Sequence, residues 1–136
     1  MIIMSKKETI VRAIITKSGS MLLCRSFEEG HYFLPGGHIE DGETPQEALD
    51  RELQEEIGVP VVKKDFITEV ENSFVQQGQV KEEIFYVYRV ELASMEEVRS
   101  WEDHIAYEWI PITDLRKVDF KPQKFLSEIE RLITDQ

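Results

Sequence analysis

The sequence predicts an α/β or α+β sandwich, and three observations lead to this fold class. Strand-like and helix-like segments follow one another in mixed order along the chain. A strand–turn–strand pattern opens the chain, and the clearest helix signals come soon after a glycine-rich segment. The chain has 136 residues, of which 41% are hydrophobic and 10% aromatic, enough for one ordinary core. We therefore expect residues 1–136 to form a single domain.

The first two strands are expected at residues 8–17 and 20–26. Residues 8–17 are rich in β-branched side chains, which favour strands, and a turn at residues 17–20 leads back into residues 20–26. Residues 27–43 are expected to be irregular, because five glycine or proline residues interrupt any regular pattern.

Residues 44–57 carry the clearest helix signals. Thr44 is a good N-cap, Pro45 suits the first helical position, and Glu47 completes a capping box with Thr44. Gly58 is expected to end the helix. Three apolar residues recur at four-residue spacing and should face the core: Leu49, Leu53 and Ile57.

The second half of the chain is expected to supply three further strands and two helices. Strand-like residue types and turn signals place the strands at residues 61–76, 82–92 and 105–110. A brief helix is expected at residues 111–117, and an amphipathic helix closes the chain at 122–134.

Composition excludes some functions. The net charge of −11 argues against general affinity for nucleic-acid backbones, unless basic residues cluster on one face. No apolar run approaches the roughly 18 residues that a membrane span needs. The single cysteine, Cys24, lies in an apolar run and is expected to be buried and inert. A cytoplasmic protein without a membrane partner is the default expectation.

An acidic cluster carries the candidate chemistry. Residues 37–59 hold eight acidic residues against one basic residue. At about 100° per residue, Glu52, Glu55 and Glu56 share an arc that adjoins the apolar side of the helix. Carboxylates in this arrangement suit hard cations, Mg²⁺ first and Mn²⁺ second. A solvated acidic helix edge is the alternative.

The residues around this cluster resemble the Nudix box. Gly37, Glu43 and the run Arg51-Glu52-Leu53-Gln54-Glu55-Glu56-Ile57-Gly58-Val59 match the box at every fixed position. The resemblance extends outside the box to Pro35-Gly36 and to Glu108-Trp109-Ile110-Pro111, so it covers nearly the whole chain. It implies an α/β/α sandwich, in which a mixed β-sheet lies between helices.

The resemblance also implies the roles of the box residues. Glu52, Glu55 and Glu56 would hold Mg²⁺, with the carbonyl of Gly36 joining them. One of these three glutamates, or a carboxylate elsewhere, would orient or deprotonate the attacking water. The scaffold of the site would be formed by Gly37, Glu43 and Arg51.

Four further residues are candidates for contacts with the substrate or for an extra acidic ligand. Arg25 is similar to an arginine that many relatives place near substrate phosphates, although a surface arginine is an equal alternative. Tyr32 could stack on a base or pack in the core. Glu102 and Asp103 precede the final strand, where relatives often place a late acidic ligand or base.

The expected activity is Mg²⁺-dependent cleavage of the diphosphate linkage in a small nucleotide. The substrate would be a nucleoside triphosphate, or a nucleoside diphosphate linked to another group. Two alternatives stay open: a Nudix-fold module that binds a nucleotide without cleaving it, and a pyrophosphohydrolase acting on RNA 5′ ends. The resemblance also allows a homodimer, and residues 74–76 carry none of the markers that separate the subfamilies.

Overall fold

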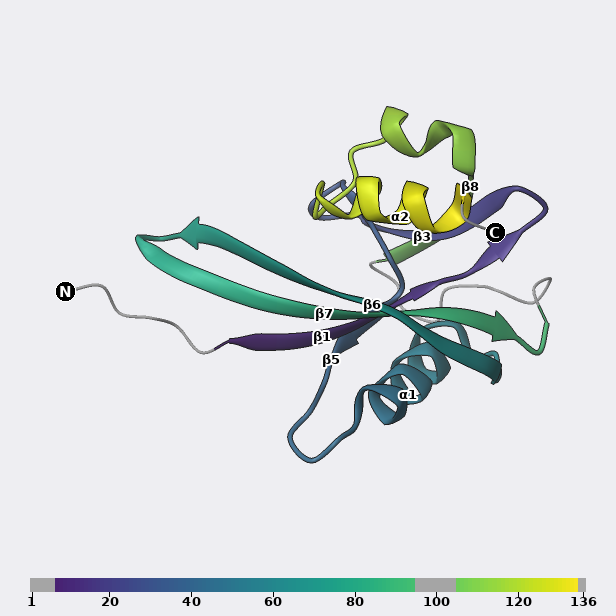
Figure 1. Cartoon of the computed structure of the whole chain (residues 1–136), viewed down its shortest axis with the longest axis horizontal. Coiled ribbons are helices and arrows are strands. Elements are labelled where there is room, and N and C mark those ends of the chain that lie inside the picture. The colour runs from purple at the N-terminus through teal and green to yellow at the C-terminus, as the bar shows by residue number, and fades with distance from the viewer. Residues whose placement is uncertain (1–6, 95–104, 135–136) are drawn as a thin grey trace.

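The computed structural model describes residues 7–94 and 105–134 (Figure 1). Its strands are β1 (Glu8–Ile14), β2 (Thr16–Lys17), β3 (Ser20–Ser26), β4 (Tyr32–Phe33), β5 (Gly36–His38), β6 (Val61–Gln76), β7 (Gln79–Leu92) and β8 (Ile105–Pro111). Its helices are α1 (Pro45–Ile57), the 3₁₀ helix η1 (Ile112–Lys117) and α2 (Phe125–Thr134). None of the described helices is long and apolar enough to cross a membrane.

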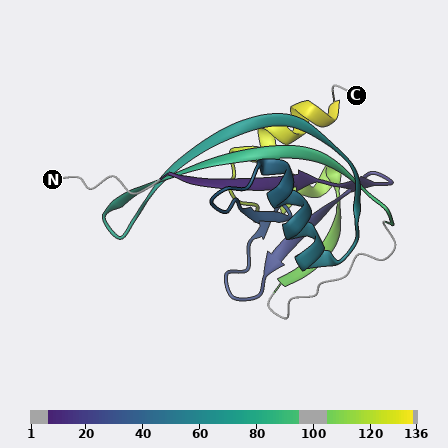
Figure 2. The same cartoon turned by 90° about the horizontal axis from the view of Figure 1, so that it is seen from below.

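Two four-stranded sheets form the centre of the molecule. The first has the order β5-β1-β7-β6 and is mixed, because β1 runs parallel to β7 and antiparallel to β5. The second is antiparallel, and in it β3 pairs with β2, β4 and β8. Helix α1 lies on one side of the sheets, and α2 lies with η1 on the other (Figures 1 and 2). The predicted α/β/α sandwich with a mixed sheet is confirmed.

The expectations for the N-terminal half need two corrections. A single strand over residues 8–17 is wrong, because the chain leaves the first sheet after Ile14 and enters the second at Thr16. The carbonyl of Ile15 accepts a 2.9 Å hydrogen bond from the amide of Leu22 at this crossing. Residues 27–43 are not wholly irregular, since they contain β4 and β5.

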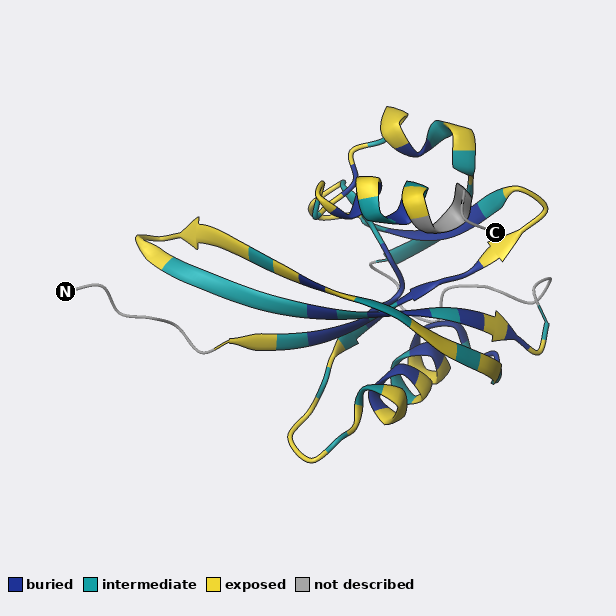
Figure 3. Cartoon of the chain, in the orientation of Figure 1, coloured by how far each residue is buried: buried dark blue, intermediate teal, exposed yellow. Residues whose placement is uncertain are grey.

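The core consists of two layers that share β1. Successive side chains of a strand point to opposite faces, and both faces of β1 are covered. Ile10 and Ile14 belong to the cluster that includes residues of α2, whereas Val11 and Ala13 belong to the cluster that includes residues of α1. Figure 3 shows β1 buried along most of its length. The first sheet therefore holds α1 in a fixed position.

Helix α1 begins and ends as its sequence predicts. The hydroxyl of Thr44 accepts a hydrogen bond of 3.1 Å from the amide of Glu47, whose carboxylate accepts one of 3.0 Å from the amide of Thr44. Gly58 adopts a left-handed conformation with φ 67°, and its amide caps the helix at the carbonyls of Leu53 and Gln54. The predicted apolar face is buried: Leu49, Leu53 and Ile57. This burial fixes the rotation of α1 about its axis.

Candidate active site

The three glutamates of α1 differ in burial. Glu56 is only 6% exposed, and the side chain of Glu52 is 17% exposed. Both lie one turn apart beside the apolar face of the helix. The side chain of Glu55 is 57% exposed and turns toward Arg51. Two of the three candidate carboxylates, those of Glu52 and Glu56, are therefore largely shielded from solvent, whereas that of Glu55 is exposed.

Glu52 and Glu56 differ in their polar partners. Burial raises the pKa of Glu52, and the hydrogen bond and positive charge of Arg51 only partly oppose this shift. The hydroxyl of Tyr107 on β8 donates a hydrogen bond of 2.9 Å to Oε2 of Glu56. Carboxylates on neighbouring turns of one helix repel each other, and a bound cation would relieve this repulsion.

The glycines before α1 leave space for these groups. A Cβ on Gly37 would lie 2.6 Å from both carboxylate oxygens of Glu52, so any side chain there would displace that carboxylate. Gly36 has φ +139°, and a Cβ there would overlap the carbonyl oxygen of Val11. The close packing of β5 against β1 thus explains Gly36 structurally, and its role as a carbonyl ligand stays a prediction.

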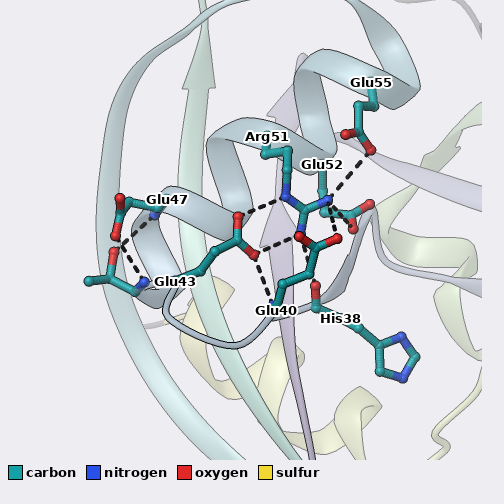
Figure 4. A network of polar contacts seen from close by, with 8 residues as sticks. His38, Glu40, Glu43, Glu47, Arg51, Glu52 and Glu55 are labelled. Atoms are coloured by element: carbon teal, nitrogen blue, oxygen red, sulfur yellow. Dashed lines mark hydrogen bonds and ion pairs between the residues drawn. The ribbon is translucent and has the colours of Figure 1, made fainter.

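Arg51 ties the loop before α1 to the helix (Figure 4). Its Nε and Nη2 donate to the two carboxylate oxygens of Glu43 over 2.7 and 2.8 Å, a bidentate pair. Nη2 also donates to the carbonyl of His38 over 3.1 Å. These bonds and the amide of Glu40 lower the pKa of Glu43 to about 2. The pair is therefore fully ionised at neutral pH.

The same guanidinium also lies close to three further carboxylates. Nη1 of Arg51 lies 3.0 Å from Oε1 of Glu52, 3.5 Å from Oε2 of Glu55 and 3.8 Å from Oε1 of Glu40. With Glu43, four carboxylates surround one positive charge. This network accounts for the stability of an acidic helix start and for the orientation of Glu55.

The donor set suits Mg²⁺ in kind, although the ligands are not gathered in this conformation. Glutamate carboxylates and a backbone carbonyl are the oxygen ligands that hard cations prefer. Within residues 7–94 and 105–134, however, no three His, Cys, Asp or Glu side chains converge as a metal site. Glu55 would have to leave Arg51 to join Glu52 and Glu56. The metal roles of the three glutamates stay predictions.

Arg25 and Tyr32 lie together on the second sheet. Nε of Arg25 is 3.6 Å from Oε2 of Glu108, and its guanidinium carbon is 5.8 Å from the ring centres of both Tyr32 and Phe27. A hydrogen bond with Glu108 raises the pKa of Tyr32. Arg25 follows Cys24 in β3, so the side chains of these two residues point to opposite faces of the second sheet.

The other two candidates, Glu102 and Asp103, lie outside the described residues.

The structure adds two residues that the sequence reasoning missed. One is Tyr107, the hydrogen-bond donor to Glu56. The other is Arg12, a half-buried arginine on β1 whose guanidinium carbon lies 5.5 Å from the ring centre of Phe33. One signal for Arg12 was present in the sequence: a charged residue between Ile10 and Ile14 on one face of an apolar strand. Tyr107 had no such local signal.

Comparisons with known proteins identify the family of the chain. A family model for the NUDIX domain matches residues 6–130. The chain is 30% identical over 126 residues to the nucleoside triphosphatase NudI of Escherichia coli, an alignment that covers 84% of this chain and 89% of that protein.

Solved structures share the fold. A MutT protein from Methanosarcina mazei has a TM-score of 0.77 and 26% identity, with 95% of this chain and 94% of that chain covered. A MutT protein from Bacillus halodurans has a TM-score of 0.74 at 19% identity, covering 86% and 76%. The fold, the box on α1 and the family match lead to one conclusion: the chain belongs to the Nudix family, whose members are hydrolases that act on pyrophosphate bonds.

Proposed function

We propose that this chain is a Mg²⁺-dependent pyrophosphohydrolase that cleaves the diphosphate linkage of a small nucleotide in the cytoplasm. The substrate is a nucleoside triphosphate, or a nucleoside diphosphate linked to another group. The observation that carries the proposal is the placement of Glu52 and Glu56 beside the buried face of α1, with Glu56 bonded to Tyr107 and the Glu52 carboxylate lying against Gly37. The likeness to a nucleoside triphosphatase supports a triphosphate substrate.

In this proposal the residues of α1 and its loop divide the work. Glu52, Glu55, Glu56 and the carbonyl of Gly36 would hold Mg²⁺, with Mn²⁺ as a substitute. A cation held by these residues would neutralise phosphate charge and supply activation of water. One of the three glutamates, or a carboxylate elsewhere, would orient the attacking water or accept its proton. Arg51 holds the loop before α1 against the helix through its two hydrogen bonds to Glu43.

The test is a panel of nucleotides incubated with and without Mg²⁺, with the products identified by mass spectrometry. We expect nucleoside monophosphate together with pyrophosphate or a second phosphorylated product, and only when Mg²⁺ is present. Glu56→Gln should abolish turnover, whereas the matched variant Glu28→Gln, in an exposed turn, should not. No turnover across the panel, or full turnover by Glu56→Gln, would refute the proposal.

A further inference from the structure

Strand β6 carries most of the large apolar side chains that the described chain exposes. Five such residues are exposed, and four of them lie on β6: Val62, Phe66, Phe74 and Val75. Val62 is 60% exposed and Phe66 is 56% exposed. Figure 3 shows exposed residues along much of this strand. Single apolar residues are common on protein surfaces, but four on one strand mark that strand as a candidate interface.

The same strand lies at the end of a sheet. Among residues 7–94 and 105–134, the ladder partner of β6 is β7 alone. An edge strand presents backbone amides and carbonyls that can pair with another strand. The carbonyl of Glu71 is occupied, because it accepts a hydrogen bond from Nζ of Lys124. Over residues 62–70, no side chain from another described element bonds the backbone, so this stretch is open to a partner strand.

Phe66 stands near the middle of the open stretch. The register of β6 and β7 shifts between Phe66 and Thr68, where a β-bulge adds Ile67. Ile67 packs against the core, whereas the ring of Phe66 meets only the edge of the sheet at Tyr88, with ring centres 5.5 Å apart. Covering Phe66 with a partner would remove apolar surface from water, which favours association.

The charges on the two sides of Phe66 have opposite signs. Lys63 and Lys64 precede it, and Glu69 and Glu71 follow it. Three of these four residues also have ion pairs within the chain, largely exposed and therefore weak. Two copies of β6 related by a two-fold axis near Phe66 run antiparallel, so the basic side of each lies beside the acidic side of the other. The strand is thus complementary in charge to a second copy of itself.

We infer that β6 is the interface for a second copy of this chain, with the two β6 strands antiparallel about a two-fold axis near Phe66. The pairing joins two four-stranded sheets into one and adds main-chain hydrogen bonds along residues 62–70. It also covers Phe66 and Val62. A peptide from another protein would satisfy the same backbone groups, but a second copy brings the matching charges by symmetry. The inference does not depend on the proposed activity.

A charge exchange tests the partner and the orientation together. The oligomeric state of the purified full chain is measured by sedimentation equilibrium over a range of concentrations. One double variant is Lys63→Glu with Lys64→Glu, and the other is Glu69→Lys with Glu71→Lys. In each variant the opposed ends of the two strands carry like charges, so the dimer should weaken by at least about tenfold. An equimolar mixture of the two variants should form a heterodimer, because opposite charges face each other again.

A second variant tests the apolar centre of the interface. Phe66→Asp should raise the dissociation constant of the dimer at least about tenfold, because it places a charge where apolar surface is buried. Phe27→Asp is the matched control, since Phe27 is 60% exposed but lies in a turn outside β6. Its dimer should match that of the wild type. Thermal unfolding establishes that each variant is folded, and the mixing experiment is read without Phe66→Asp.

Three results would overturn the inference. A wild-type protein that is monomeric at every concentration leaves the lysines and bulges of β6 as protection against pairing. A dimer that persists in both double variants and in Phe66→Asp uses another surface. A mixture of the two double variants that stays monomeric excludes the antiparallel arrangement. None of these results bears on the proposed hydrolysis, which is measured separately with nucleotides.

Discussion

The hydroxyl of Tyr107 donates a hydrogen bond of 2.9 Å to Oε2 of Glu56, and so joins β8 to α1 across 51 positions of sequence. Tyr107 also contacts Cys24, its partner in the register of β3 and β8. Burial strongly raises the pKa of the Tyr107 phenol, which therefore stays protonated and remains a donor at neutral pH. The bond fixes the position of Oε2 of Glu56.

Tyr107→Phe should weaken metal binding. Groups that orient a metal ligand typically change metal affinity by about 10–100-fold when removed. We expect the dissociation constant for Mn²⁺, measured by electron paramagnetic resonance, to rise by at least about tenfold. Tyr86→Phe is the matched control, since it removes a tyrosine hydroxyl from β7, where Tyr86 pairs with Glu69 of β6. Wild-type Mn²⁺ affinity in Tyr107→Phe would show that Glu56 needs no such orientation.

Gly37→Ala should reduce turnover more than stability. Its Cβ would push against the carboxylate of Glu52, and a displacement near 1 Å at a reacting centre costs about 100-fold in rate. Gly42→Ala should do the opposite: its surroundings are open, but φ +86° strains an alanine by about 1 kcal/mol. Steady-state kinetics and denaturant unfolding of both variants check the pair. Equal effects on both quantities would contradict it.

Acid should weaken the contribution of Glu43. Its pKa is about 2 in the folded protein, against 4.5 for the free side chain. Because the folded pKa is the lower one, the stabilisation is fully present above pH 4.5 and is lost as the pH falls from 4.5 through 2. The gap in free energy of unfolding between wild type and Glu43→Gln should therefore close over this window. The control Glu28→Gln should show no such convergence, and a gap independent of pH would be inconsistent with the Arg51 pair.

Thr44→Ala should destabilise the protein by about 1 kcal/mol through loss of the N-cap. The reciprocal bonds between Thr44 and Glu47 would both be affected, but neither residue touches Glu52 or Glu56. Chemical denaturation should report the loss, while turnover at a temperature where the variant is folded should stay near wild type. The exposed Thr16→Ala serves as control. A large loss of turnover in folded Thr44→Ala would implicate the cap in the site.

The bounds of α1 were predicted well from the sequence, because the residues that begin and end a helix lie at or next to its ends. The cap at Thr44, the stop at Gly58 and the buried Leu53 follow from residues within a few positions of each other. Tyr107 could not be placed in this way. Its contact with Glu56 depends on strand register and on the packing of distant segments, which a single sequence does not specify.

Glu55 shows a different limit of the sequence argument. Helical geometry places it on an arc with Glu52 and Glu56, yet its carboxylate faces Arg51. The position of a residue around the helix fixes the direction of its Cβ, but the nearest opposite charge determines where the carboxylate of a flexible glutamate lies.

The four carboxylates around Arg51 have a consequence for the charge of the helix start. One guanidinium offsets only one of these four negative charges, so the network as a whole stays negative. The start of α1 is therefore held together by Arg51 and still attracts cations from solution.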